Sequence, residues 1–235
     1  MSTNEPVVLV TGSGGTLGRA TAQLFAEQNA RLALLDRNPE HLQRVYGSGE
    51  TGTRLLLSAD LLDREAVATA VDRTIAHFGQ IDALINIAGG FHMGEAVHET
   101  DASTWEGMFN LNVRTMTNTV QAVVPHMLAA GRGKIVNIGA YAARHGGARK
   151  GAYIASKSAV IRITESMALE LREHGINVNC VLPTIIDTPA NRADMPDADP
   201  ARWVAPEALA DVIAFLASDA ARAVHGAALP VTGLS

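Results

Sequence analysis

The chain reads VVLVTGSGGTLG from Val7 to Gly18, which places a glycine-rich turn directly after a short apolar run. Glycine allows a backbone to turn sharply and to approach a ligand closely. The next residues, 17–28, carry apolar side chains at helical spacing, so a helix is expected to begin at the turn. The first turn of a helix offers free N–H groups and a positive partial charge. This stretch therefore predicts a strand, a turn and a helix that can hold a diphosphate.

Short apolar runs alternate with amphipathic segments along the rest of the chain. Residues 64–78, for example, repeat apolar side chains with the period of a helix. Such alternation is typical of a parallel sheet that is buried on both faces. The apolar runs are Val7–Val10, Leu32–Leu35, Leu55–Leu57, Ala83–Ile87, Ile135–Ile138, Val178–Leu182 and Ala228–Val231. We therefore expect one α/β domain over residues 1–235, a doubly wound, mostly parallel sheet of seven strands with helices on both faces.

The composition excludes several classes of protein. Of 235 residues, 47% are hydrophobic and 18% are charged, and the net charge is −5, so the chain is not a disordered or nucleic-acid-binding type. The N-terminus lacks a signal-peptide pattern, and no apolar run is long enough to cross a membrane, which together favour a cytoplasmic location. Cys180 stands alone in an apolar run and is expected in the core. The eight histidines show no metal-ligand spacing, so we expect no metal.

The segment Asp194–Pro206 differs from its surroundings because it holds three prolines and three aspartates. It follows the strand predicted to end at Leu182. Ligands bind at the carboxyl edge of parallel sheets, so a long irregular segment there is often functional. We expect residues 189–206 to form a loop that covers a substrate, although a plain surface loop is the simpler alternative.

The second strand ends at Asp36, 18 residues after Gly18. A carboxylate at this point can accept hydrogen bonds from the ribose of a dinucleotide. It would also repel a 2′-phosphate, which favours NAD(H) over NADP(H). Arg37 works in the opposite direction, because a guanidinium binds phosphate well.

Tyr153 and Lys157 stand four residues apart, and on a helix they would share one face. A free tyrosine has a pKa near ~10 and is a poor acid or base at neutral pH. A neighbouring cation stabilises the phenolate, so we expect Lys157 to lower the pKa of Tyr153. Taken alone, the pair could equally be an ordinary surface pair.

Taken together, these features resemble the short-chain dehydrogenase/reductase family over nearly the whole chain, from Val7 to Leu234. The resemblance implies a Rossmann-type sheet, a nicotinamide cofactor, hydride transfer and a homodimer or homotetramer. It implies catalysis by Tyr153, Lys157 and Asn112. The cofactor-binding residues that it implies are Gly12, Gly14, Gly15, Thr16, Leu17, Gly18, Asp36, Arg37, Asp60, Leu61, Asn86, Ala88, Gly89, Tyr153, Lys157, Pro183, Ile186 and Thr188.

One departure from the family pattern concerns the chemistry directly. The family has a catalytic serine 13 residues before the tyrosine, and this chain has Ala140 there, with no Ser or Thr from Ile135 to Ala152. Three explanations are open. The substrate needs no such donor, the hydroxyl of Tyr141 replaces it, or the protein binds a cofactor and catalyses poorly.

The first explanation fits a subfamily, the quinonoid dihydropteridine reductases, which this chain resembles at Ala140 and along Leu182–Arg192. That resemblance implies NADH-dependent reduction of a conjugated acceptor. A ketone reductase or secondary alcohol dehydrogenase is the alternative, and a non-catalytic nucleotide-binding sensor or scaffold is the alternative from another class. The candidate substrate residues are Ala140, Tyr141, His92 and Asn191.

Overall fold

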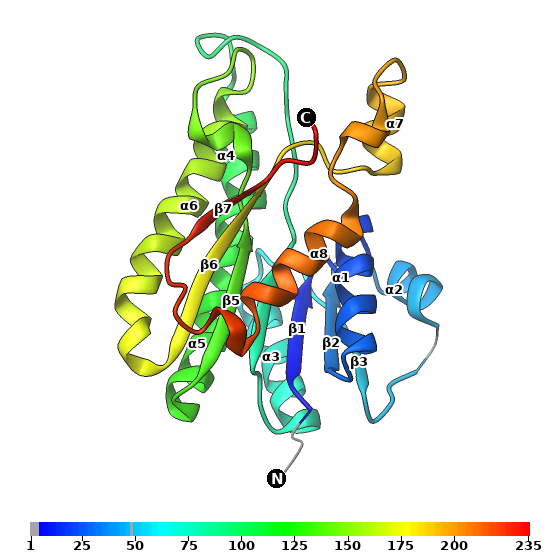
Figure 1. Cartoon of the computed structure of the whole chain (residues 1–235), viewed down its shortest axis with the longest axis vertical. Coiled ribbons are helices and arrows are strands. Elements are labelled where there is room, and N and C mark those ends of the chain that lie inside the picture. The colour runs from blue at the N-terminus through cyan, green and yellow to red at the C-terminus, as the bar shows by residue number, and fades with distance from the viewer. Residues whose placement is uncertain (1–4, 48) are drawn as a thin grey trace.

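The computed structural model describes residues 5–47 and 49–235, and in these residues seven strands form a single parallel sheet. The strand order is β3-β2-β1-β4-β5-β6-β7 (Figure 1). The predicted doubly wound sheet is confirmed, with every described strand pair parallel. The strands are β1 Val7–Thr11, β2 Arg31–Asp36, β3 Arg54–Ser58, β4 Ala83–Asn86, β5 Gly133–Ile138, β6 Ile176–Pro183 and β7 Ala228–Val231.

Helices connect the strands, and side-chain caps fix where several of them begin. Asn38, Asp63, Asp101 and Thr188 each accept a hydrogen bond from an N–H group in the first turn of the following helix. The helices are α1 Thr16–Glu27, α2 Pro39–Tyr46, α3 Arg64–Phe78, α4 Ala102–Phe109, α5 Thr115–Ala130, α6 Gly151–Leu171, α7 Pro189–Asp194 and α8 Pro206–Leu216.

Most strand residues are apolar and buried because helices cover both faces of the sheet. Neighbouring residues of a strand point to opposite faces. In β1, Leu9 packs with the buried side chains of α3, α5 and α6, whereas Val8 and Val10 pack with those of α1 and α8. Figure 1 shows α1 and α8 in front of the sheet and α3 and α5 behind it. Cys180 of β6 is fully buried in the core, as expected.

The order of the strands reverses next to β1, because the chain first builds outward to β3 and then returns to add β4 on the other side. Ligands of such sheets bind beyond the carboxyl ends of the strands at this reversal. In Figure 1 these ends point upward, and α4 and α7 rise above them. The fold thus brings the glycine turn after β1 and the segments after β4, β5 and β6 to one edge.

The segment 189–206 is more ordered than the sequence suggests. Its first six residues form helix α7, Pro200–Arg202 form a short 3₁₀ turn, and residues 195–199 and 203–205 lie in no helix or strand; that the segment covers a substrate stays a prediction. The physical reason for the helix is local, because Thr188 caps α7 and Pro189 occupies its first turn. The main chain is then tied down where the N–H of Asp187 donates to the carbonyl of Val204 at 2.8 Å.

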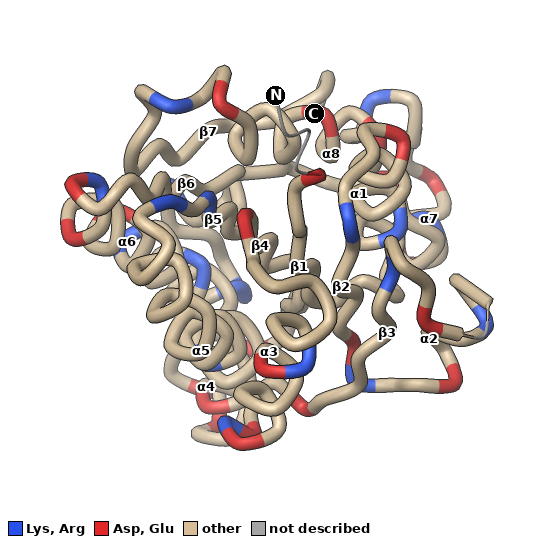
Figure 2. The backbone as a smooth tube through the Cα atoms, turned by 90° about the horizontal axis from the view of Figure 1, so that it is seen from below, with Lys and Arg blue, Asp and Glu red and all other residues tan. Residues whose placement is uncertain are grey.

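Charged side chains of both signs are intermixed around the molecule (Figure 2). Among the residues that the structure describes, none of the helices has the length and apolar character needed to span a bilayer.

Candidate active site

The glycine turn after β1 is wound tightly against the loop that follows β4. Gly12 has a φ of 63°, a left-handed conformation that side chains disfavour. A Cβ atom at Gly12 would also lie 2.9 Å from the backbone nitrogen of Ala88. The side chain of Thr11 secures the same contact, because its Oγ1 accepts hydrogen bonds from the N–H groups of Ile87 and Ala88 at 3.1 and 3.2 Å. Glycine is therefore required here by both conformation and space.

Helix α1 begins differently from helices α2, α3, α4 and α7. Its N-cap is Gly15, which offers no side-chain cap, and its first turn holds no acidic residue. The first N–H groups of α1 are therefore not bonded to a capping side chain and face the turn of Gly12–Gly15. Such a helix start suits the diphosphate of a dinucleotide, so the predicted residues Gly14, Thr16, Leu17 and Gly18 fit the cofactor.

Two residues of α2 hold the outer side of the glycine turn. The hydroxyl of Tyr46 donates to the carbonyl of Ser13 at 2.6 Å, and Nε2 of His41 lies 2.9 Å from the carbonyl oxygen of Gly14. Burial raises the pKa of Tyr46, which keeps the phenol protonated and able to donate. The sequence patterns did not indicate either residue, because the contact depends on how α2 packs.

Asp36 lies where the sequence predicted it, at the end of β2 beside the turn. Its Oδ2 accepts from the N–H of Gly14 at 3.0 Å, and its Oδ1 accepts from the N–H of Arg37 at 2.7 Å. Arg37 is exposed to solvent. At the end of β3, Asp60 accepts from the N–H of Leu62 at 2.9 Å, and the carbonyl of buried Leu61 accepts from Asn118. These residues line the same edge as the glycine turn.

A buried polar network joins the ends of β4 and β5. The side chain of Asn86 donates to Asn137 at 2.9 Å and accepts from Thr119 at 2.7 Å. Asn137 in turn donates to Thr164 of α6 at 2.9 Å. The four side chains are buried and mutually bonded, which fixes the strand ends relative to α5 and α6. Asn86 was expected near the cofactor, whereas Asn137 carried no recognisable signal in the sequence.

Asn112 lies in a π-helical turn, Asn110–Arg114, inserted between α4 and α5. Such turns often occur at functional sites because they redirect one side chain. Oδ1 of Asn112 accepts from the N–H of Gly90 at 2.9 Å, and its Nδ2 donates to the carbonyl of Gly90 and to Oγ of Ser156 at 3.1 and 3.0 Å. The side chain thus connects the loop after β4 to helix α6.

Lys157 meets Asn112 beside Gly89. A Cβ atom at Gly89 would stand 2.8 Å from Oδ1 of Asn112 and 3.1 Å from Nζ of Lys157. Lys157 is 6% exposed, and its ammonium donates to the carbonyl of Ile138 at 2.8 Å. Burial lowers the pKa of Lys157 to about 8, because the charged form is poorly solvated there.

Tyr153 is half-buried, one helical turn before Lys157, and the ring of Phe91 covers it. The two ring centroids are 4.8 Å apart in an edge-to-face arrangement. Burial raises the pKa of Tyr153 to about 12. The expectation that Lys157 lowers this pKa is therefore wrong for this structure. The desolvation of the phenol dominates, and the ammonium is directed to Ile138.

Ala140 lies at the end of β5 and is buried, with no side-chain donor of its own. The neighbouring Tyr141 packs against the apolar cluster of α6 and β6, and Arg144 lies over its ring at 5.3 Å. Within the described residues the Tyr141 hydroxyl makes no hydrogen bond. A role for the Tyr141 hydroxyl as a donor to the substrate oxygen stays a prediction, and the structure shows the Tyr141 ring in packing contacts.

The remaining predicted residues lie at the same edge with varied local roles. The hydroxyl of Thr188 caps α7, and the side chain of Asn191 donates to the carbonyl of Ile186 at 2.8 Å. Both contacts shape the segment that follows Pro183 at the end of β6. His92 lies after the loop of β4, with its Nε2 3.7 Å from a carboxylate oxygen of Glu95.

Phe91 and Ser156 belong to the site but were not anticipated. Phe91 carries no motif, and its contact with Tyr153 arises only when the loop after β4 folds over α6. Ser156 links Asn112 to the carbonyl of Tyr153, to which its hydroxyl donates at 2.7 Å. Its position within the segment from Tyr153 to Lys157 was a usable signal.

Comparison with known proteins agrees with this geometry. The family model described as short chain dehydrogenase matches residues 6–199. The chain belongs to the short-chain dehydrogenase family. It is 35% identical over 238 residues to cis-4-hydroxycyclohexanecarboxylate dehydrogenase of Sinomonas cyclohexanicum, covering 97% of this chain and 96% of that protein.

Solved structures of short-chain dehydrogenases extend the match to three dimensions. The crystal structure of 3-ketoacyl-(acyl-carrier-protein) reductase from Brucella melitensis complexed with NADH superposes with a TM-score of 0.88, at 28% identity and 98% coverage of both chains. ElxO with NADP bound superposes with a TM-score of 0.89, at 25% identity, covering 97% of this chain and 98% of that one. The predicted family and its Rossmann-type fold are thus confirmed, and this short-chain dehydrogenase is an oxidoreductase.

Proposed function

We propose that this chain is an NAD(H)-dependent oxidoreductase that interconverts a ketone and a secondary alcohol. The observation that carries the proposal is that Asn112 and Lys157 meet at Gly89, in the loop that packs on the glycine turn, with Tyr153 one helical turn before Lys157. A phenol next to a dinucleotide site supplies the proton transfer that carbonyl reduction requires. The relative that acts on cis-4-hydroxycyclohexanecarboxylate and the NADH-bound 3-ketoacyl reductase support this substrate class by their names.

The choice of NAD(H) rests on Asp36. Its carboxylate is held at the glycine turn by the N–H of Gly14, where the adenosine ribose is expected. A 2′-phosphate would bring a second negative charge to this carboxylate and lose binding energy. One structural neighbour carries NADH and another carries NADP, so the neighbours do not decide the cofactor. The proposed preference for NAD(H) depends on whether repulsion by Asp36 outweighs attraction by Arg37 for a 2′-phosphate.

The proposed mechanism assigns a separate task to each side chain. Lys157 would hold the ribose next to the nicotinamide of a bound cofactor, and that cofactor would supply or accept the hydride. Tyr153 transfers the proton to or from the substrate oxygen. At neutral pH Tyr153 carries the proton that reduction requires, but burial raises its pKa to about 12 and makes the phenol a weaker acid than a free tyrosine. Asn112 positions the loop of Gly90 against α6, and a water relay from Lys157 remains a prediction.

A second candidate reaction is the reduction of a conjugated acceptor, as in the dihydropteridine reductases. Ala140 favours it, because no hydroxyl stands where the family has its serine. Loss of one preorganised donor typically costs about 2.7–4 kcal/mol in a transition state. An electron-poor quinonoid ring accepts hydride readily and tolerates that loss better than a simple ketone. The buried alanine is thus the main argument against the first candidate.

A substrate panel with NADH and NADPH separates these reactions. The purified protein is incubated with cyclic ketones, linear ketones or a quinonoid dihydropterin, and the absorbance of NADH or NADPH is followed over time. We expect ketone reduction with NADH, and we expect Ala140→Ser to accelerate it, because the substitution restores a donor to the substrate oxygen. Ala142→Ser is the matched control, since Ala142 is exposed in the adjacent 3₁₀ turn.

Two outcomes would change the proposal. Turnover of the dihydropterin alone, unchanged or lowered by Ala140→Ser, would support the second candidate and contradict the first. Tight NADH binding without turnover of any acceptor would contradict both and indicate a nucleotide-binding sensor or scaffold.

We also propose that the chain assembles into a homodimer or homotetramer in the cytoplasm. Exposed apolar side chains support assembly, among them Leu128 on α5 and Leu169 on α6, which are 41% and 65% exposed. Light scattering of the purified protein tests this, and a monomer at micromolar concentration would contradict it.

A further inference from the structure

The ring of Phe91 contacts both Tyr153 and Lys150. The ring of Phe91 stands edge-to-face on Tyr153, with centroids 4.8 Å apart. The ammonium of Lys150 lies over the Phe91 ring, 5.8 Å from its centroid. Lys150 directly precedes α6 and stands three residues before Tyr153. Both residues therefore reach the Phe91 ring from the N-terminal end of α6. An apolar surface therefore separates the phenol from a positive charge.

Lys150 is available to a ligand. Within residues 5–47 and 49–235 it takes part in no ion pair, and its ammonium lies over the Phe91 ring. A cation at the start of a helix is also disfavoured by the helix dipole, typically by about 0.3–1 kcal/mol. The charge of Lys150 therefore does not stabilise the start of α6, so helix stability does not explain a lysine at this position.

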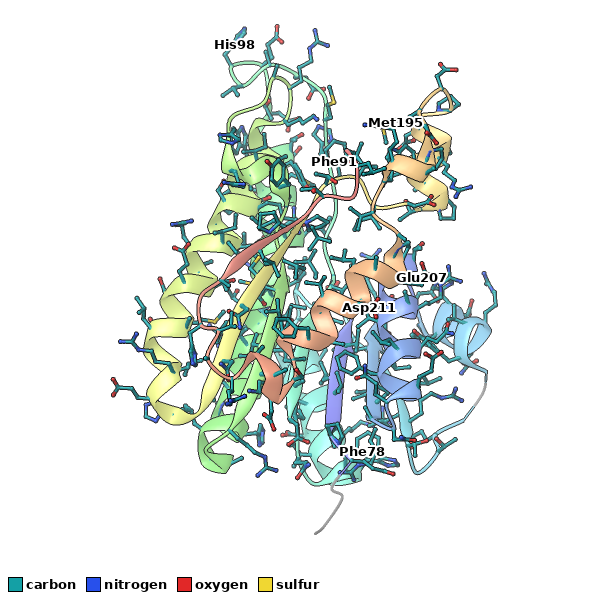
Figure 3. The ribbon with its side chains drawn as sticks, in the orientation of Figure 1. Phe78, Phe91, His98, Met195, Glu207 and Asp211 are labelled. Carbon is teal, nitrogen blue, oxygen red and sulfur yellow. The ribbon has the colours of Figure 1, made fainter. Side chains whose placement is uncertain are left out.

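Phe91 offers an apolar surface at the same place. It is 58% exposed, although a large apolar side chain gains about 1.5–3 kcal/mol when fully buried. Figure 3 shows Phe91 at the upper end of the molecule, the same end as Met195 next to α7. The ring therefore stands at the carboxyl edge of the sheet, where this fold binds its ligands.

We propose that Phe91 and Lys150 form a subsite for a substrate that carries a carboxylate on an apolar, cyclic body. The ring of the substrate packs against Phe91, its carboxylate pairs with Lys150, and its oxygen function reaches Tyr153. Attraction between the charges is stronger beside an apolar ring than in open water. This inference rests on the proposed ketone reduction and defines its substrate class.

The test uses two probes that differ in charge and hardly in shape. These are 4-oxocyclohexanecarboxylate and 4-oxocyclohexanecarboxamide, each reduced with NADH. For the natural sequence we expect a KM at least tenfold lower for the acid than for the amide. Lys150→Gln should raise the KM of the acid to that of the amide with little change in kcat, whereas Lys150→Arg should retain the preference.

Control variants distinguish the effect of the Lys150 charge from that of other positive charges on the surface. Arg149→Gln removes the adjacent exposed cation and should leave the ratio of the two KM values unchanged. Phe91→Ala should raise the KM of acid and amide alike, because it removes the apolar surface and not the charge. Equal KM values for the two probes in the natural sequence would overturn the inference, and so would a preference that Lys150→Gln leaves intact.

Calorimetry distinguishes failure of the inference from failure of the proposed function. Cyclohexanecarboxylate, which carries no ketone, is titrated into the protein in the presence of NADH, and cyclohexanecarboxamide is the comparison. Binding of the acid that Lys150→Gln abolishes supports the subsite even if no ketone is reduced. Equal or absent binding of both compounds, in a protein that does reduce ketones, contradicts the subsite alone.

Discussion

On the β1–β2 side of the site the backbone leaves no room for a side chain, whereas on the β5–α6 side buried side chains hold one another. Gly12 lies against Ala88, and the helix start at Gly15 exposes bare N–H groups. Across the edge, Asn112 bonds to Ser156, and Lys157 bonds to the carbonyl of Ile138. The first half of the site, on the β1–β2 side, depends on glycines that lack a side chain. The second half, on the β5–α6 side, depends on the functional groups of its side chains.

This difference explains where the family pattern can change. An added carbon atom at Gly12 or Gly18 would press on backbone atoms, so few substitutions are acceptable at these two positions. On the other side, a residue such as Ala140 is buried at the site and contributes no functional group of its own. The four experiments below challenge this contrast, beginning with the largest expected effect.

Tyr153→Phe tests whether the β5–α6 side of the site depends on a functional group, because it removes only the hydroxyl of Tyr153. The ring and its contact with Phe91 are retained, so NADH should bind with nearly unchanged affinity. Turnover should fall by roughly 10²–10⁴-fold, the usual contribution of a general acid or base. Steady-state rates and a fluorescence titration with NADH measure the two effects. Tyr141→Phe, measured in parallel, shows whether the other hydroxyl of the site contributes, and retained turnover in Tyr153→Phe would remove Tyr153 from the mechanism.

Gly12→Ala tests the steric requirement of the first half. The new Cβ would lie 2.9 Å from the nitrogen of Ala88, at a φ of 63°. The left-handed conformation alone costs roughly 1–2 kcal/mol for a residue with a side chain. We expect the Kd for NADH to rise at least tenfold and the Tm to fall. Gly52→Ala is the control, because nothing lies within 4 Å of its added Cβ; equal behaviour of the two variants would contradict the steric account.

Lys157→Met tests the electrostatic cost of the second half. The pKa of Lys157 is lowered from 10.5 to about 8, so burial of the ammonium opposes folding below pH 8. This cost disappears as the pH rises from about 8 to 10.5, where the unfolded chain still binds the proton and the folded chain does not. At about 1.4 kcal/mol per pKa unit, the cost is about 3 kcal/mol.

The measurement is the free energy of unfolding by urea at pH 7 to 10. The variant should gain stability relative to the natural sequence at pH 7, and this gain should shrink towards pH 10. A gain that does not change with pH would mean that Lys157 is solvated in the folded state.

Asp36→Ala returns to the first half and should have the smallest effect. Removing the carboxylate takes away the repulsion of a 2′-phosphate, and Arg37 remains to bind one. The ratio of kcat/KM for NADPH to that for NADH should rise by about tenfold, equivalent to about 1.4 kcal/mol. Asp60→Ala serves for comparison, and an unchanged ratio in Asp36→Ala would show that Asp36 does not face the ribose.

The sequence predicts the glycine side better than the side-chain cluster. Apolar runs such as Leu32–Leu35 report burial on two faces directly, and Gly12 or Asp36 is recognised from local spacing. Tyr153 and Lys157 are also found locally, because four residues separate them on one helix. The bonds of Asn137 and the cover of Phe91 over Tyr153 are not local, since they depend on how separate segments pack. The error in the pKa of Tyr153 has the same origin, because spacing shows a neighbouring cation and not the loss of solvent.

The π-helical turn at Asn110–Arg114 has a consequence for how this chain can diverge. One surplus residue in the helix rotates Asn112 inward, and a single deletion there would swing every following side chain by about 100°. Surface loops can lengthen or shorten without such a penalty. Descendants of this protein can therefore change the loops around the site, whereas the number of residues in the continuous helical segment from α4 to α5 must be conserved.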